Sequence, residues 1–314
     1  MVSPTPTASN SVAALPTDPQ SVFALLQTYW RTAYPAAFGT AFAELRGGFQ
    51  PLDSGLRTGS ALCIGSPEQL TGNAYYCPDS DGIAYDTGVL VPVLLQHYGP
   101  AGLLSSLAHE FGHAVAARIG VATGPAVVRE MQADCFAGNF MRSVAGLDLV
   151  AALAPLLDFG DQVTVKPTDP TAHGLAIDRA QSVQLGYRNG PTECRDITVT
   201  SISMALGRFE VPADRSARAV AAVDVTAPDR TLAASLGDFA LAAAAVREAA
   251  AGDSPAVTGC RVGSWTARLF GSVPPDQLGG RLSDPDEALN LLRARPGVTV
   301  EELFGFLDGF AGRC

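Results

Sequence analysis

A five-residue run at positions 109–113, His-Glu-Phe-Gly-His, constrains the fold of this chain more than any other feature. Residues four apart lie on the same face of an α-helix, so His109 and His113 can present both imidazoles to one zinc ion. Glu110 directly follows the first histidine, and its carboxylate can reach a water on the metal without taking a coordination position. The run therefore predicts a metal site with a general base beside it, on the condition that it lies in a helix.

The surrounding sequence predicts that helix. Apolar residues recur at helical spacing from Ala101 to Arg118, after a Gly99-Pro100 break and before Gly120. The alternative is a pair of histidines packed in an apolar core. A charged glutamate beside two histidines on a half-buried helix needs a partner, which weighs against that alternative.

A second segment, at 130–138, supplies the ligand that the first segment lacks. A hydrolytic zinc site takes three protein ligands and leaves the fourth position to water. Glu130 and Asp134 are four apart and share a helical face. We expect Glu130 to be the third ligand and Asp134 to accept the ring N–H of His109, which would fix its tautomer. A solvated acidic helix face is the alternative, and the apolar residues around the two carboxylates argue against it.

A β-hairpin is predicted before the histidine helix. Residues 73–77 and 83–86 are short β-prone runs, and the Asp-Gly step between them suits a hairpin turn. The exposed edge of such a sheet can bind an extended peptide through backbone hydrogen bonds. A calcium loop built from Asp79, Asp81 and Asp86 is the alternative, but it has too few ligands at the spacing of an EF-hand.

The H-E-F-G-H run and the E-x-Q-A-D-C-x-A-G run from Glu130 together resemble the neutral zinc metallopeptidases of bacteria. Their layout is similar to thermolysin-like enzymes more broadly. The segments at 72–86 and 173–187 add to the resemblance, which spans about residues 60–195 and departs at Met131, where the family usually has leucine. That change conserves volume. The resemblance implies a zincin-like catalytic core with one zinc ion per chain and a peptide or protein substrate.

Further roles are implied by the same resemblance. Asn73, Ala74 and the adjacent Tyr75 would lie on the strand that binds substrate. His173, which precedes Gly174 in a Pro- and Thr-rich loop, would donate a hydrogen bond to the oxyanion as water adds to the carbonyl. The alternative for His173 is a surface residue at the start of a helix.

Two more residues have open interpretations. Arg179 would either orient the substrate carbonyl or brace the loop before it. His97 is interpreted as structural.

Six cysteines form an even set without C-x-x-C spacing, which favours disulfides over a zinc knuckle or a thioredoxin-like site. Sequence alone does not choose among the possible pairings. Pairing each cysteine with its neighbour predicts the bridges Cys63–Cys77, Cys135–Cys194 and Cys260–Cys314. A nucleophilic role for Cys135 is disfavoured because it adjoins the carboxylate of Asp134.

Composition excludes several classes of partner. The net charge is −10 and the arginines are dispersed, which argues against binding to nucleic acid or to an anionic membrane. The longest apolar runs are far shorter than the roughly 20 residues that cross a bilayer, so no transmembrane segment is predicted.

The chain is expected to be mostly α-helical with a small β-sheet, in three parts. Residues 1–20 read as a disordered Pro/Ser/Thr-rich linker, 21–195 as the catalytic domain, and 196–314 as a helical region that packs on it or forms a separate domain. The first helix is expected from Ser21 to the Tyr34-Pro35 step. The helices expected after Cys194 are 200–208, 216–223, 232–251, 263–270, 286–293 and 300–310, with Asp284, Pro285 and Glu287 starting one of them.

The lead segment bears on localisation. It has no basic or apolar region typical of a signal peptide, and it resembles the linker left when an export signal or lipid anchor is removed. We therefore expect a secreted or cell-envelope protein. A disordered cytosolic tail is the alternative, and disulfide formation would distinguish the two.

These observations predict a zinc-dependent endopeptidase in which Glu110 activates the attacking water. A catalytically silent, zinc-stabilised protein that binds peptides on its edge strand is the alternative from another class. A protein that processes only itself is the third possibility. Complete ligands together with Glu110 argue against a scaffold, which has no need of a base beside the metal.

Overall fold

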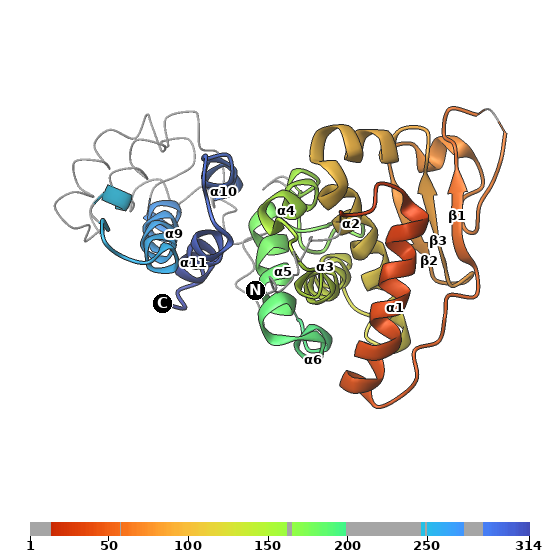
Figure 1. Cartoon of the computed structure of the whole chain (residues 1–314), viewed down its shortest axis with the longest axis horizontal. Coiled ribbons are helices and arrows are strands. Elements are labelled where there is room, and N and C mark those ends of the chain that lie inside the picture. Colours follow the sequence, from red (N-terminus) through yellow and green to blue (C-terminus); the bar gives the residue numbers. More distant parts are fainter. Residues whose placement is uncertain (1–13, 57, 162–164, 199–245, 249, 273–284) are drawn as a thin grey trace, which may run out of the picture.

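The computed structural model describes residues 14–56, 58–161, 165–198, 246–248, 250–272 and 285–314. Within these residues the fold is mostly helical with one small sheet, as the sequence predicts. Figure 1 shows the sheet and the first helix at one end of the molecule, a central group of helices, and the last three helices at the other end. The helices are α1 (Pro19–Phe38), η1 (Pro67–Leu70), α2 (Leu90–Arg118), α3 (Ala126–Arg142), α4 (Leu149–Asp158), α5 (Ala176–Asn189), α6 (Pro191–Arg195), α9 (Pro255–Ser272), α10 (Pro285–Arg293) and α11 (Val300–Phe310).

The predicted hairpin is present as β2 (Ala74–Cys77) and β3 (Gly82–Asp86). Asp81 in the turn has a positive φ of 51°, a conformation that Asp tolerates better than most residues. A third strand, β1 (Gly48–Leu52), pairs with β3 in parallel and gives the order β1-β3-β2. The sequence analysis missed β1, whose Pro51 is tolerated because β1 is an edge strand.

Helix α1 runs further than expected. Its N-cap Asp18 accepts from the N–H of Ser21, so the helix begins at Pro19, inside the segment expected to be linker. The expected stop at Pro35 is wrong: the helix continues to Phe38. Proline removes one helical hydrogen bond, and the packing of the Tyr34 ring against Phe38 and Phe42 offsets that loss.

Helix α2 carries the histidine run, and the expected break lies inside it. Gly99 has φ 66° and ψ −167°, a conformation outside the helical region, and Pro100 starts the second part. The part from Ala101 onward is almost entirely buried, including Phe111, which stacks on Phe42 and Phe49. The helix therefore runs through the core, where contacts on its buried faces set its register.

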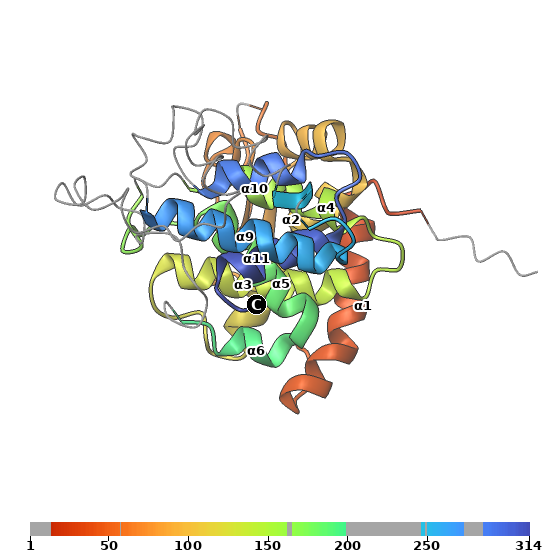
Figure 2. The same ribbon diagram turned by 90° about the vertical axis from the view of Figure 1, so that its left-hand side faces the viewer.

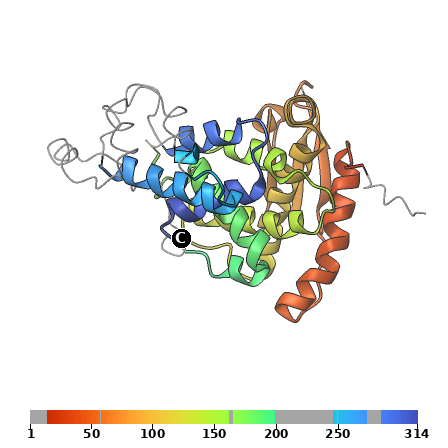
Figure 3. The same ribbon diagram turned by 60° about the vertical axis from the view of Figure 1, so that its left-hand side comes forward.

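The last three helices cover α4 and α5, as Figures 2 and 3 show from two further directions. Helices α9 and α11 pack very closely: a Cβ built on Gly263 would lie 1.9 Å from the carbonyl oxygen of Phe306. The expected helices at 286–293 and 300–310 match α10 and α11, and the expected 263–270 helix begins earlier, at Pro255. The helices expected at 200–208 and 216–223, most of 232–251, and the cap at Asp284 lie outside the described residues.

The six cysteines form three disulfides, Cys63–Cys77, Cys135–Cys194 and Cys260–Cys314, the same pairs that joining neighbours suggested. Disulfides of this number suggest an extracytoplasmic protein. In the described part of the chain, no helix is both long and apolar enough to span a bilayer. Most of the predicted linker, residues 1–13, lies outside the described residues.

Candidate metal centre

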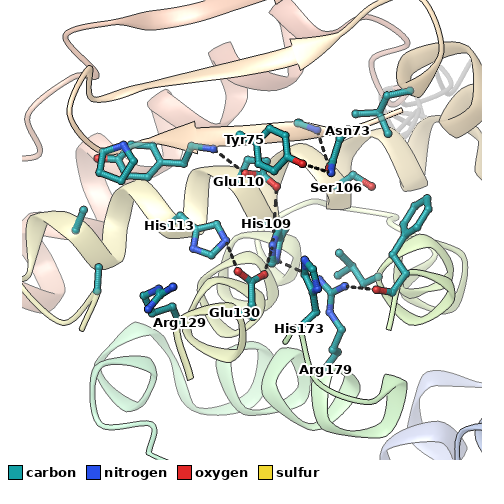
Figure 4. Close-up of a pocket in the computed structure, with 18 of the residues that line it drawn as sticks. Asn73, Tyr75, Ser106, His109, Glu110, His113, Arg129, Glu130, His173 and Arg179 are labelled. Atoms are coloured by element: carbon teal, nitrogen blue, oxygen red, sulfur yellow. Dashed lines mark hydrogen bonds and ion pairs between the residues drawn. The ribbon is translucent and has the colours of Figure 1, made fainter. Parts of the chain in front are cut away.

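Three side chains from two helices meet at one point. His109 and His113 lie on one face of α2, and Glu130 of α3 reaches both: its oxygens lie 3.1 Å from Nε2 of His109 and 3.4 Å from Nε2 of His113. Among the described residues, this is the only group of three His, Cys, Asp or Glu side chains whose ligand atoms all lie within 4.8 Å of one another. Figure 4 shows the three side chains converging.

The approach of α3 to α2 depends on glycine. Gly112 lies between the two histidines in sequence, and a Cβ built on it would lie 2.4 Å from the carbonyl oxygen of Ala133 and 2.8 Å from its Cα. Those distances are far inside van der Waals contact. The two helix backbones therefore touch at Gly112, one helical turn from Glu130, and this contact brings the carboxylate to the imidazoles.

The donor set fits a metal ion. Two neutral imidazoles and one carboxylate are a common ligand set of catalytic zinc. Donors about 2.0–2.1 Å from a tetrahedral ion lie about 3.3 Å apart, and the contacts of Glu130 with His109 and His113 are 3.1 and 3.4 Å. These residues could therefore hold a metal ion.

A buried ion pair between Asp134 and Arg179 contacts the Nδ1 side of the His109 ring. Nδ1 of His109 lies 2.7 Å from Oδ1 of Asp134, which is fully buried. Arg179 of α5 donates to both oxygens of Asp134, from Nε at 2.8 Å and from Nη2 at 3.0 Å. Asp134 thus fixes the ring so that Nε2 faces Glu130, and the guanidinium neutralises the buried carboxylate.

Glu110 lies between the histidines and the sheet. Its Oε2 accepts from the backbone N–H of Tyr76 at 2.9 Å, and its Oε1 lies 3.9 Å from Nε2 of His109. The N–H of Tyr76 points away from β3, so the outer edge of β2 faces the cleft. Figure 4 shows Glu110 under this strand.

The pKa values of these groups follow from burial and charge. Burial lowers the pKa of His109, but the charge and hydrogen bond of Asp134 and the hydrogen bond of Glu130 outweigh it and raise the pKa to about 10. Burial raises the pKa of Glu110, and the nearby histidines oppose this only in part. Burial also acts to raise the pKa of Glu130, but His113 and His109 hold it well below its usual value.

The site opens into a cleft of about 690 Å³. Residues of β2, α2, α3, α4 and α5 line it, and His173 lies on the α5 side, half exposed. The backbone N–H groups of His173 and Gly174 both donate to Oδ2 of Asp161, at 2.5 and 2.7 Å. The cleft therefore has the carboxylate of Glu110 on one wall and the imidazole of His173 on the other, with the three candidate ligands between them.

The structure brings the expected substrate residues to the cleft as well. Asn73, Ala74 and Tyr75 all line it, and the side chain of Asn73 is held by the N–H of Ala74 and the hydroxyl of Tyr75. Arg179 also lines it, and it donates to both oxygens of Asp134 in α3, a partner that neither of its two expected roles included.

Two alternatives find no support in the geometry. Asp81 pairs with Arg118, and Asp86 accepts from backbone N–H groups such as that of Gly72, so these acids do not form a calcium loop. Cys135 is disulfide-bonded and has no thiol for nucleophilic attack. His97 is not among the residues that line the cleft.

Several residues that shape the site were not found from sequence. Asp161 and the backbone of Tyr76 gave no local signal, because their roles depend on contacts across the fold. The signal for Gly112 was present: a glycine inside a strongly predicted helix costs helical stability, and it commonly marks a close approach of another backbone. Gly138 and Gly186 follow the same rule, with a built Cβ 2.2 Å from the carbonyl oxygen of Val183 and 1.8 Å from that of Cys135.

Comparisons with known proteins find distant and partial relatives. Uncharacterized proteins from Mycobacterium bovis and from two strains of Mycobacterium tuberculosis are each 30% identical to this chain, over an alignment that covers 38% of this chain and 53% of the relative. The chain thus spans about half the length of the curated relatives it matches. No family model matches the sequence, and no solved structure matches it. What the comparisons and the geometry jointly establish is distant homology to these mycobacterial proteins and a His-His-Glu group that could bind a metal ion.

Proposed function

We propose that this protein is a zinc-dependent endopeptidase. The observation that carries the proposal is the carboxylate of Glu110, held by the N–H of Tyr76 beside the group formed by His109, His113 and Glu130. A zinc ion bound by that group would polarise a peptide carbonyl and lower the pKa of water to about 7. The resemblance to neutral zinc metallopeptidases supports the same assignment.

Glu110 is the general base in this proposal. It takes a proton from the attacking water and passes it to the departing amine nitrogen. Burial raises its pKa, which makes the carboxylate a stronger base and helps it to keep the proton until the amine leaves. The hydrogen bond from the backbone N–H of Tyr76 holds Oε2 of Glu110 at strand β2, and Oε1 of Glu110 faces His109.

The substrate would bind as an extended strand along the outer edge of β2. Ala74 has the same orientation in the strand as Tyr76, because residues two apart in a strand point the same way. Backbone contacts of this kind hold a peptide bond over the site whatever its side chains are. His173, on the opposite wall, would donate a hydrogen bond to the oxygen of the carbonyl as its negative charge develops.

Metal analysis combined with digestion of a peptide library tests the proposal. The wild type should contain about one zinc ion per chain and cleave peptides. Glu110→Gln should retain the zinc and lose at least about 100-fold in kcat, because general acid–base catalysis contributes about 10²–10⁴-fold. The matched control is Glu44→Gln, which removes a surface carboxylate paired with Arg31 and should cleave at the wild-type rate.

Two results would contradict the proposal. One is a fully active preparation without metal, and the other is near wild-type turnover by Glu110→Gln. Zinc binding and peptide binding without any cleavage by the wild type would instead support the silent, peptide-binding protein.

A further inference from the structure

Three carboxylates from separate places in the sequence hold five consecutive backbone N–H groups at residues 173–177. Asp161 accepts the first two, Asp178 accepts the third, and Asp286 accepts the last two. This segment contains His173 and the first turn of α5. The N–H groups of a first helical turn have no partners within the helix, so their partners determine how firmly the turn is held.

Asp286 is the most distant of the three in sequence. It belongs to α10, and its two oxygens accept from Ala176 at 2.7 Å and from Ile177 at 2.9 Å, across 110 and 109 positions of the chain. Its side chain is buried. A buried carboxylate that accepts two N–H groups at a helix N-terminus forms strong, charge-assisted hydrogen bonds and also interacts favourably with the helix dipole.

The cap lies only three residues from His173. Between them, Gly174 has a positive φ of 95°, a Cβ built on it would lie 3.2 Å from Cε of Met131, and Leu175 donates to Asp178. Little freedom remains in such a short, bonded segment. A shift of the first turn of α5 therefore moves the backbone of His173.

Helix α10 also contacts a second segment of the cleft wall, at the end of α4. Arg293 pairs with Asp158 at the end of α4, and Tyr98 of α2 donates to the same carboxylate at 3.0 Å. Phe159, the next residue after Asp158, lines the cleft. The last part of the chain thus touches two segments of the cleft wall through carboxylate contacts.

We propose that Asp286 is a positioning residue for His173, so that the C-terminal helices complete the site rather than merely cover it. This inference rests on the proposed function, because His173 matters only if a carbonyl reacts in the cleft. Asp286 touches no substrate; it acts through the first turn of α5.

The test compares Asp286→Asn with Asp308→Asn in the full-length chain. Asp308 is the matched control, since it also joins the C-terminal helices to α5 but binds Gln184 and Arg188, toward the other end of that helix. Asparagine keeps the shape of aspartate but offers one acceptor oxygen instead of two. Asp286→Asn should speed amide hydrogen exchange at Ala176 and Ile177 by about 10- to 100-fold.

The kinetic and spectroscopic readouts separate positioning from general stability. Asp286→Asn should lower kcat by about tenfold with KM and zinc content unchanged, because a misplaced transition-state donor costs turnover rather than binding. The NMR shifts of the His173 ring should also move. Asp308→Asn should change none of these.

Equal loss of kcat in both variants, or faster exchange in Asp286→Asn with unchanged kcat, would overturn the inference. If the wild type cleaves no peptide, the proposed function fails, and the His173 ring shifts still decide the positioning: unchanged shifts in Asp286→Asn reject it. If Asp286→Asn does not fold, amide exchange measured on the wild type tests the cap instead. Exchange at Ala176 and Ile177 as fast as in an uncapped first turn would reject the cap itself.

Discussion

Replacing Gly112 by alanine adds only one methyl group, but it should weaken zinc binding at the metal centre. The new Cβ would lie 2.4 Å from the carbonyl oxygen of Ala133, and ordinary contact begins near 3.4 Å. The atoms in the way are backbone, which no side-chain rotation can clear. Helices α2 and α3 must therefore separate by about 1 Å.

That displacement acts directly on the candidate ligands. Glu130 lies one turn before Ala133, and the contacts of 3.1 and 3.4 Å that it makes with His109 and His113 would lengthen by a similar amount. Overpacking costs about 1–3 kcal/mol, and the better helix propensity of alanine returns about 1 kcal/mol. We expect the metal-free variant to lose between about 0 and 2 kcal/mol of unfolding free energy and its zinc affinity to fall about 10- to 100-fold.

Gly263→Ala is the matched control. It creates a similar backbone clash, 1.9 Å from the carbonyl oxygen of Phe306, between α9 and α11 and away from the histidines. Chemical denaturation measures stability, and competition with a chromophoric chelator measures zinc affinity. The reasoning is refuted if Gly112→Ala binds zinc as the wild type does, or if Gly263→Ala weakens zinc binding as strongly.

Four further outcomes are expected. Zinc binding at pH 7 should release about one proton, because the metal-free pKa of His109 is about 10 and a ligand imidazole must be neutral. Calorimetry in buffers of different ionisation enthalpy measures this release. A binding enthalpy that does not depend on the buffer would show that the prediction is wrong. His173→Ala should lower kcat far more than it raises KM. In the wild type, the hydrogen bond with Asp161 raises the pKa of His173, so the donating imidazolium persists above pH 6.5 and kcat should fall as pH rises through that pKa; a pH profile without an alkaline limb that depends on His173 would contradict this. Replacing Cys135 and Cys194 by alanine should cost about 4 kcal/mol of unfolding free energy from loop entropy over 59 positions, measured by denaturant titration, and an unchanged midpoint would show that the bridge contributes nothing.

Much of the secondary structure could be predicted because its signals are local. The hairpin followed from β-prone runs around an Asp-Gly step, and the histidine helix followed from apolar spacing between a Gly-Pro break and Gly120. The incorrect predictions also came from local signals, and in the structure tertiary packing outweighs those signals. Pro35 was expected to end α1, and strand β1, which contains a proline and follows Gly47, was not predicted.

The residues of the candidate site could be named from sequence, but their supports could not. The i, i+4 spacing placed His109 beside His113 and Glu130 beside Asp134, since helical geometry alone puts such residues on one face. No spacing rule relates Asp161 to His173, which lie 12 positions apart in the sequence.

The amino-acid sequence by itself determined the chemistry available to this protein: which imidazoles and carboxylates share a helix face, and which base follows the first histidine. Which residues share a face depends on the 3.6-residue repeat of the α-helix, and this repeat is the same wherever the helix lies in the fold. Tertiary structure alone decided that Glu130 reaches both histidines, that Arg179 neutralises Asp134, and that a carboxylate of α10 caps the helix after His173. Such contacts depend on how closely whole helices pack and on which buried charges must be paired. The local periodicity of the sequence determines neither of these.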